Sequence, residues 1–172
     1  MEHPTYRTLA GVLRNIPVPI GLSLVLSRKF PRHDRSTAGT LPLLVFFVED
    51  EALIQDLLVD PLEDAGYEVL VASSGREALK LLDGQEAASI RALVTDIQLG
   101  ASSLTGWEVA HRAREVHPDI PVVYITGDSA QDWSSQGVPN SLLITKPFAP
   151  AQIVTAISHL LNQASSGLSA ST

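Results

Sequence analysis

The chain has 172 residues and a net charge of −7, and its hydrophobic fraction of 45% is sufficient for one domain with a buried core. It contains no cysteine, which excludes disulfide bonds, thiolate metal sites and cysteine nucleophiles and is compatible with a reducing cytoplasm. No apolar run approaches the roughly 20 residues of a membrane span, so we expect a cytoplasmic protein that binds no membrane.

The charge is distributed unevenly along the chain. Residues 1–42 carry six basic and two acidic residues, 6 − 2 = +4, whereas the remainder carries six basic and 17 acidic residues, 6 − 17 = −11. An acidic domain is poorly suited to hold a phosphate backbone, so we expect no nucleic-acid partner. Five prolines interrupt residues 1–42. We interpret this stretch as a disordered or loosely ordered N-terminal extension, with a functional arm as the alternative.

From residue 43 onward, apolar strands alternate with amphipathic helices. The first strand, 43–48, is apolar throughout, which is typical of a strand buried on both faces of a parallel sheet. The next elements in chain order are a helix over 53–65, a strand over 67–72, a helix from a cap at Ser73 or Ser74 to near Gly84, a strand over 91–95, a helix over 106–117, a strand over 122–126, a weak helix over 130–136, a strand over 142–145 and a helix over 149–162. Pro61 falls inside the first helix, where we expect a kink or break.

This alternation predicts a doubly wound α/β fold, with a five-stranded parallel sheet and helices on both faces. The predicted organisation is an extension over 1–42, one folded domain over 43–163 and a flexible, serine-rich tail over 164–172.

Polar side chains stand at the ends of four predicted strands. Glu49 and Asp50 follow the first strand, Asp96 the third, Thr126 ends the fourth and Lys146 follows the fifth. Because ligands of an open parallel sheet bind beyond the carboxyl ends of its strands, we expect these groups to converge. Neighbouring carboxylates repel each other, and Mg²⁺, which prefers oxygen ligands, would relieve that repulsion. Asp96 could then act as a nucleophile that forms an aspartyl phosphate, held by Lys146 and Thr126.

Four short stretches, one at each of these strand ends, resemble the motifs of receiver domains in two-component signalling. They are Phe-Val-Glu-Asp-Glu at 47–51, Leu-Val-Thr-Asp at 93–96, Val-Tyr-Ile-Thr-Gly at 123–127 and Thr-Lys-Pro-Phe at 145–148. The resemblance extends over about 120 residues. It implies the strand order 2-1-3-4-5.

The same resemblance implies the chemistry of the site. Mg²⁺ would be bound by Glu49, Asp50, Asp96 and the backbone carbonyl of Gln98, and Asp96 would accept a phosphoryl group from a histidine kinase or a histidine phosphotransferase. The peptide bond between Lys146 and its proline would be cis. Thr126 and Lys146 would contact the phosphoryl group. The protein would not be an enzyme, apart from its own Mg²⁺-dependent phosphorylation and dephosphorylation.

The implied function is that of a bacterial single-domain response regulator. Only about ten residues follow the last predicted helix, so we expect the output to be a contact with an unidentified downstream protein, or the removal of phosphate from a shared kinase. One alternative is a degenerate receiver that binds partners without phosphorylation. A remote alternative is a hydrolase of the haloacid-dehalogenase type, which needs an acid/base Asp where Gln98 stands.

Three positions depart from the family pattern or vary within it. Leu143 stands where the family usually has Tyr or Phe, so we expect the signal to leave through Thr126 and the segment that follows it. Gln98 and Asp128 each lie two residues after a motif residue, where side chains in the family contact or block the attacking water. We therefore expect both of them to influence the lifetime of the phosphoryl group.

Overall fold

The computed structural model describes residues 42–100 and 104–168, and the expected N-terminal extension lies almost entirely outside these residues. Five parallel strands form one sheet in the order β2-β1-β3-β4-β5, which confirms the predicted fold class and strand order. The strands are β1 (Leu43–Val48), β2 (Tyr67–Ala72), β3 (Ile90–Asp96), β4 (Val122–Thr126) and β5 (Ser141–Thr145).

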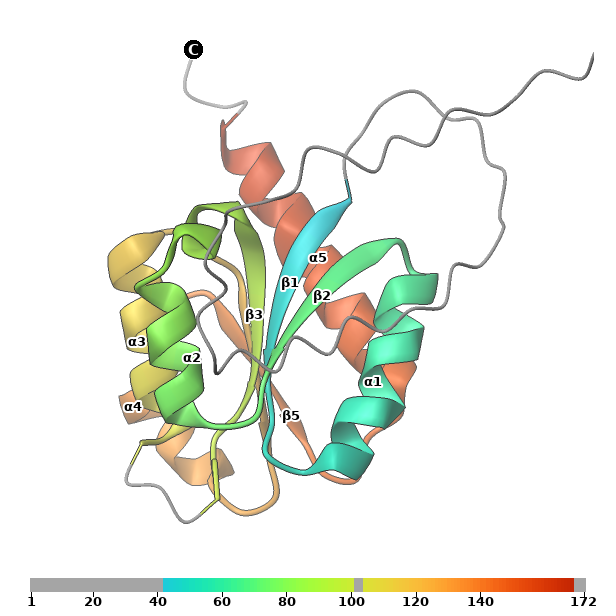
Figure 1. Cartoon of the computed structure of the whole chain (residues 1–172), viewed down its shortest axis with the longest axis vertical. Helices are drawn as coiled ribbons and strands as arrows, with labels where there is room; N and C mark the ends of the chain where they lie inside the picture. The colour runs from blue at the N-terminus through green and yellow to red at the C-terminus, as the bar shows by residue number, and fades with distance from the viewer. Residues whose placement is uncertain (1–41, 101–103, 169–172) are drawn as a thin grey trace, which may run out of the picture. The chain divides into compact units, whose positions relative to one another are not determined.

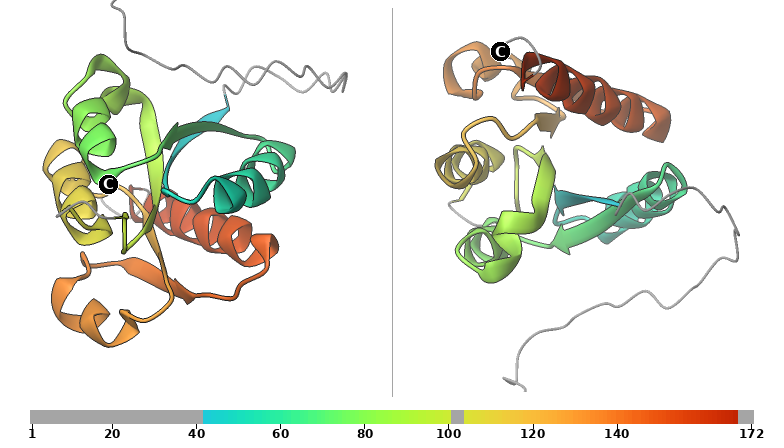
Figure 2. Two further views of the ribbon diagram at one scale, coloured as in Figure 1. Left: turned by 60° about the horizontal axis from the view of Figure 1, so that its bottom comes forward. Right: turned by 90° about the horizontal axis from the view of Figure 1, so that it is seen from above.

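Helices cover both faces of the sheet, as Figures 1 and 2 show. On one face lie α1 and α5, and on the other lie α2, α3 and the short α4. The helices are α1 (Ala52–Asp64), α2 (Gly75–Leu82), α3 (Gly106–Val116), α4 (Trp133–Gln136) and α5 (Pro150–Leu168), with 3₁₀ turns η1 (Gln85–Ser89) and η2 (Ala130–Asp132). Within the described residues, no helix is long and apolar enough to cross a membrane.

The apolar strands build two cores because successive side chains of a strand point to opposite faces. In β1, Phe46 and Val48 enter the core beneath α2 and α3, whereas Val45 and Phe47 enter the core beneath α1 and α5. All four side chains are fully buried. The sheet is therefore a rigid platform whose strand ends hold the polar residues.

Two details of the helices differ from the sequence predictions. The predicted break at Pro61 is wrong, because α1 runs without interruption from Ala52 to Asp64. Pro61 falls in the last turn, so its missing N–H removes one hydrogen bond near a helix end that is exposed to solvent. The last helix also continues to Leu168 rather than ending at Asn162, so part of the predicted flexible tail is helical and 169–172 lie outside the described residues.

Candidate functional site

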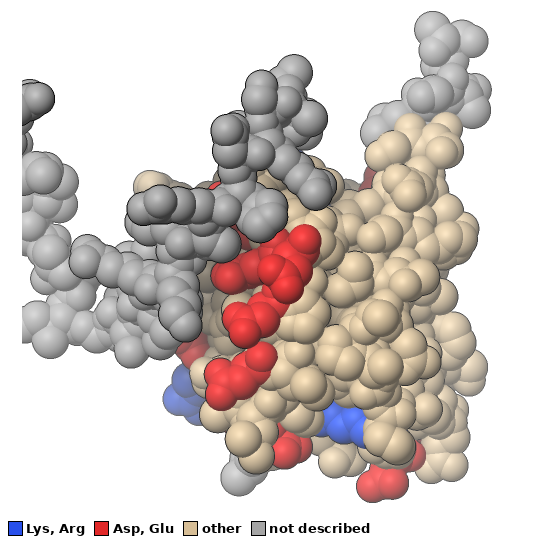
Figure 3. All heavy atoms as spheres, turned by 90° about the vertical axis from the view of Figure 1, so that its right-hand side faces the viewer, with Lys and Arg blue, Asp and Glu red and all other residues tan. Residues whose placement is uncertain are grey.

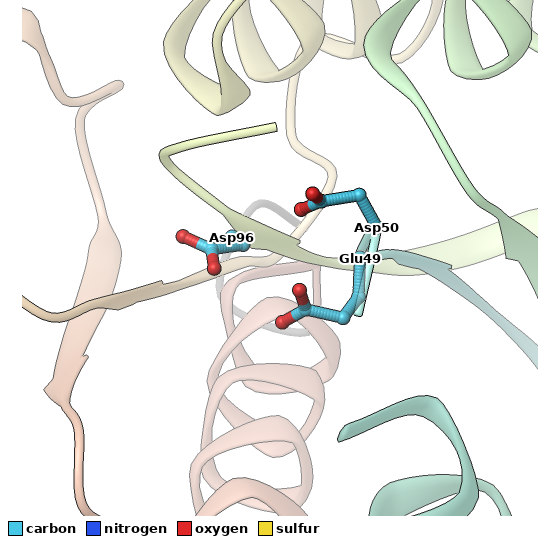
Figure 4. A group of neighbouring side chains, drawn as sticks. All are labelled: Glu49, Asp50 and Asp96. Carbon is cyan, nitrogen blue, oxygen red and sulfur yellow. The ribbon is translucent and has the colours of Figure 1, made fainter. Parts of the chain in front are cut away.

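Three carboxylates meet at the carboxyl ends of two neighbouring strands. Glu49 and Asp50 directly follow β1, and Asp96 is the last residue of β3. The parallel pairing of β1 with β3 brings the two strand ends to the same level. One oxygen from each carboxylate lies within 4.8 Å of the others, and Figure 4 shows the three groups turned to the same side. The predicted convergence of the three acids is therefore present in the fold.

Glu49 occupies an unfavourable position for a charged carboxylate. Its side chain is fully buried, and burial followed by the negative charge of Asp96 raises its pKa from 4.5 to about 7. The backbone N–H of Glu51 donates a hydrogen bond to Glu49 Oε1 at 3.2 Å, and this bond offsets only part of the penalty. The hydrogen bonds and positive charge that the protein supplies therefore do not fully offset the cost of a buried, charged Glu49.

Lys146, directly after β5, reaches into this cluster. Its Nζ donates hydrogen bonds to Asp96 Oδ2 at 2.5 Å and to Glu49 Oε2 at 3.3 Å, and it lies 3.7 Å from Glu51 Oε1. Burial opposes the charge of the ammonium group, but the hydrogen bond and charge of Asp96 outweigh it and raise the pKa of Lys146. The Lys146–Pro147 peptide bond is cis, as the resemblance implied.

Thr126, the last residue of β4, lies fully buried beside the end of β3. Its Oγ1 accepts a hydrogen bond from Ser129 N at 2.9 Å, which leaves the hydroxyl proton free to be donated elsewhere. Its carbonyl oxygen accepts a hydrogen bond from Lys146 N at 2.7 Å. Thr126 and Lys146 are therefore fixed to each other through the backbone.

A polar chain joins Asp96 to the segment that follows β4. Gln98 N donates a hydrogen bond to Asp96 Oδ1 at 2.9 Å, and Gln98 Nε2 lies 3.5 Å from Ser129 Oγ. Ser129 N also donates a hydrogen bond to Thr126, so Ser129 contacts both Thr126 and the Gln98 side chain. Sequence analysis did not single out Ser129, although its position three residues after Thr126 is the spacing of a local hydroxyl-to-backbone bond.

Glycine at position 106 is required by the close packing of α3 against the site. A Cβ atom there would lie 2.1 Å from the carbonyl oxygen of Asp96 and 2.8 Å from Thr95 Oγ1. No side chain can be accommodated at these distances, so Gly106 allows α3 to begin directly against the end of β3. Sequence analysis used Gly106 only as a helix boundary and missed this role.

The donor set suits a hard divalent cation. Glu49 and Asp96 are buried, whereas Asp50 is exposed, so a cation held by all three would keep access to water ligands as Mg²⁺ prefers. A positive ion would also offset the burial and the repulsion from Asp96 that together raise the pKa of Glu49. The three acids therefore fit Mg²⁺ on chemical grounds.

Comparison with known proteins agrees with this geometry. The family model of the response regulator receiver domain matches residues 45–158. The chain belongs to this family. The receiver domain is a component of two-component systems, and it is not an enzyme in the usual sense.

Individual relatives support the same assignment. The chain is 32% identical over 119 residues to the response regulator receiver protein CpdR of Brucella abortus, covering 68% of this chain and 95% of CpdR. A crystal structure of a response regulator receiver protein from Sinorhizobium medicae is 41% identical, with a TM-score of 0.67, covering 70% of this chain and 95% of that one. The chain spans about half the length of other curated relatives, such as the response regulator SaeR of Staphylococcus epidermidis, which is 28% identical with 68% of this chain and 49% of SaeR covered.

Proposed function

We propose that this receiver domain is a phosphorylation switch in which Asp96 accepts the phosphoryl group. The observation that carries the proposal is the direct contact of Lys146 with Asp96 and Glu49 at 2.5 and 3.3 Å, beside a cluster of three acids. Burying charged groups costs free energy of desolvation, and groups held in this way are found most often at functional sites. The phosphoryl donor would be a histidine kinase or a histidine phosphotransferase.

Mg²⁺ would be held by Glu49, Asp50, Asp96 and the backbone carbonyl of Gln98. When bound, it would supply neutralising charge to the phosphoryl group during transfer. An Asp96 carboxylate oxygen attacks phosphorus, forming an oxygen–phosphorus bond. The nitrogen–phosphorus bond of the phosphohistidine breaks, and its electron pair returns to the imidazole. Gln98 N orients the Asp96 carboxylate by its hydrogen bond to Oδ1.

The remaining residues hold the product. Lys146 already lies against the Asp96 carboxylate and would pair with an oxygen of the new phosphoryl group. The Thr126 hydroxyl, whose oxygen is fixed by Ser129 N, would donate its proton to another phosphoryl oxygen. Movement of Thr126 toward that oxygen would pull on Ser129 and therefore on the segment η2–α4. The signal would leave through this segment to a downstream protein, or the domain would drain phosphate from a shared kinase.

The test is phosphorylation with a small donor. The purified chain is incubated with Mg²⁺ and either acetyl phosphate or phosphoramidate, and its intact mass is measured. We expect a gain of one phosphoryl group that is absent in Asp96→Asn and retained in Asp119→Asn, an exposed acid in the loop before β4 at the other end of the sheet. If the wild-type chain gains no mass under any of these conditions, the switch is refuted and the degenerate receiver is favoured.

A further inference from the structure

The peptide that joins Glu49 to Asp50 carries a bend in the chain. Successive side chains of an extended strand point to opposite faces, so two neighbouring residues at a strand end would ordinarily direct their carboxylates apart. Here the chain bends at Asp50, and Figure 4 shows that both carboxylates turn back toward Asp96. The convergence of the three acids therefore depends on the orientation of this one peptide.

Gln55, in the first turn of α1, holds this peptide. Its Nε2 donates a hydrogen bond to the carbonyl oxygen of Glu49 at 2.5 Å and another to Ser73 Oγ, directly after β2, at 3.2 Å. An amide nitrogen carries two N–H groups, so the two contacts use its full donor capacity. Gln55 thus joins the end of β1, the end of β2 and the start of α1 at one point.

The other contacts of the bend act on different groups. Glu51 N donates a hydrogen bond to the Glu49 carboxylate, so it fixes the side chain of Glu49 rather than the peptide. Gly100 limits the space around Asp50, because a Cβ atom at position 100 would lie 3.0 Å from Asp50 Oδ2. Within residues 42–100 and 104–168, Gln55 is the side chain that holds the carbonyl oxygen of the bend.

Gln55 holds the bend without adding charge. Lys146 also contacts the cluster, but its ammonium group neutralises part of the negative charge that would attract a cation. The amide of Gln55 is neutral, and α1 contains no lysine or arginine. The exposed acids of α1 are Asp56, Asp60, Glu63 and Asp64. Figure 3 shows acidic side chains in a column on the side of the molecule that carries this helix. The helix therefore orients the carboxylates and leaves their charge available to a cation.

We propose that Gln55 is a positioning residue of the cation site. Through the Glu49 carbonyl it sets the bend that directs Asp50 toward Asp96, and it thereby sets the affinity for Mg²⁺. The identity of the ligand rests on the proposed function, whereas the bend is a property of the metal-free chain. A hydrogen bond that served only the fold would affect stability alone, whereas positioning affects the affinity for the cation.

Calorimetric titration of the full chain with MgCl₂ separates the two roles. Gln55→Met keeps the length of the side chain and removes its donors, so it should weaken Mg²⁺ binding by about tenfold. The control is Tyr67→Phe, which removes a 2.8 Å hydrogen bond to Ser158 at the opposite end of β2. It should lower stability in urea and leave the Mg²⁺ affinity unchanged. Wild-type affinity in Gln55→Met, or an equal loss of affinity in both variants, would overturn the proposal.

A second measurement needs no metal. In triple-resonance spectra of the metal-free chain, the carbonyl ¹³C signal of Glu49 reports hydrogen bonding at that oxygen, and the amide signal of Asp50 reports the bend. Gln55→Met should shift both signals, whereas Tyr67→Phe should leave both in place. Unshifted signals in Gln55→Met would overturn the proposal. A wild type that binds no Mg²⁺ would instead count against the proposed function, and these two signals would still decide whether Gln55 fixes the bend.

Discussion

The two halves of the site differ in their electrostatics. The β1–β3 half carries three acids whose oxygens lie within 4.8 Å of one another, and burial together with Asp96 raises the pKa of Glu49 to about 7. The β4–β5 half carries Thr126 and Lys146, and its polar groups are joined to each other and to Ser129 by hydrogen bonds. In the first half, burial and repulsion disfavour the charged form of Glu49, whereas the polar groups of the second half are joined by hydrogen bonds within the protein.

Under the proposed function, the β1–β3 half would bind the ligands and the β4–β5 half would transmit the signal. The acidic half is destabilised by burial and repulsion, and under the proposed function a bound cation would offset that cost. In the β4–β5 half, the hydrogen bonds from Ser129 N to Thr126 Oγ1 and from Asp132 N to the carbonyl oxygen of Ser129 connect the site to η2, so a change at Asp96 would have a structural route outward. Substitution of the buried Glu49 in the first half should therefore alter ligand affinity and stability in opposite directions, and substitutions in the second half should not.

Asp50→Asn should have a large effect on the binding of Mg²⁺. Asp50 is exposed, so losing its charge should weaken Mg²⁺ binding by about ten- to a hundredfold with little change in stability. Isothermal titration calorimetry with MgCl₂ measures the affinity. Asp60→Asn removes another exposed acid, which lies in α1 away from the cluster, and serves as the control. Equal affinities for the two variants would remove Asp50 from the metal site.

Glu49→Gln should stabilise the protein when Mg²⁺ is absent. The raised pKa of Glu49 means that the folded state disfavours its charge at pH 7, so a neutral side chain should raise the free energy of unfolding by roughly 2–3 kcal/mol. Urea unfolding in EDTA measures this difference. With saturating Mg²⁺ the wild type should recover the deficit and the variant should not. A variant that is less stable in EDTA would contradict the electrostatic account of the acidic half.

Tyr124→Phe probes the β4–β5 half, where stability should fall. Tyr124 is fully buried, its ring packs on Trp107, and its hydroxyl accepts a hydrogen bond from Val138 N at 3.2 Å. The variant leaves that buried N–H without its partner and should cost about 1–2 kcal/mol at pH 7. A variant as stable as the wild type at this pH would show that the hydrogen bond contributes nothing.

The same substitution has a pH dependence of known sign. Burial raises the pKa of Tyr124 in the folded state above its unfolded value of about 10. The unfolded chain therefore loses this proton first, and the stability that Tyr124 contributes falls as pH rises above about 10. Phenylalanine has no proton to lose, so the stability gap between wild type and variant should narrow between pH 7 and about pH 11.

The smallest effect should be kinetic. Asp128 lies exposed two residues after Thr126, where its side chain could position the water that hydrolyses the aspartyl phosphate. Asp128→Ala should lengthen the phosphoryl half-life by a few-fold, on the order of 1 kcal/mol in the barrier. Mass spectrometry after removal of the small donor gives the half-life, and Asp132→Ala in η2 is the control. An unchanged half-life would exclude a role for Asp128.

Most of the strands could be predicted from the sequence because their apolar runs are long and their ends carry polar residues. The end of α5 could not be predicted, since serine disfavours the interior of helices. In the structure, Ser165 and Ser166 donate hydrogen bonds to the carbonyl oxygens of Leu161 and Asn162, so the serines remain compatible with helix. The turn η1 was missed because no periodicity marks so short an element.

For the site, the convergence of the acids followed from topology alone. Parallel strands end at one edge, so Glu49, Asp50 and Asp96 had to lie close together once the strand order was known. The connections made by Ser129 and the packing of Gly106 depend on the path of loops and on a helix position that no periodicity encodes. The sequence therefore predicts which groups meet, whereas their hydrogen bonds and packing are seen only in the structure.

The brevity of α4 has an energetic consequence. A helix of four residues has barely one turn, and the first turn is the part of a helix that is least favourable to form. Unfolding or rearranging α4 therefore costs little free energy compared with unfolding α1 or α5. Trp133 begins this turn and is held by a 3.0 Å hydrogen bond from its indole nitrogen to Ser141, so rearrangement here would alter the tryptophan's surroundings and its emission spectrum.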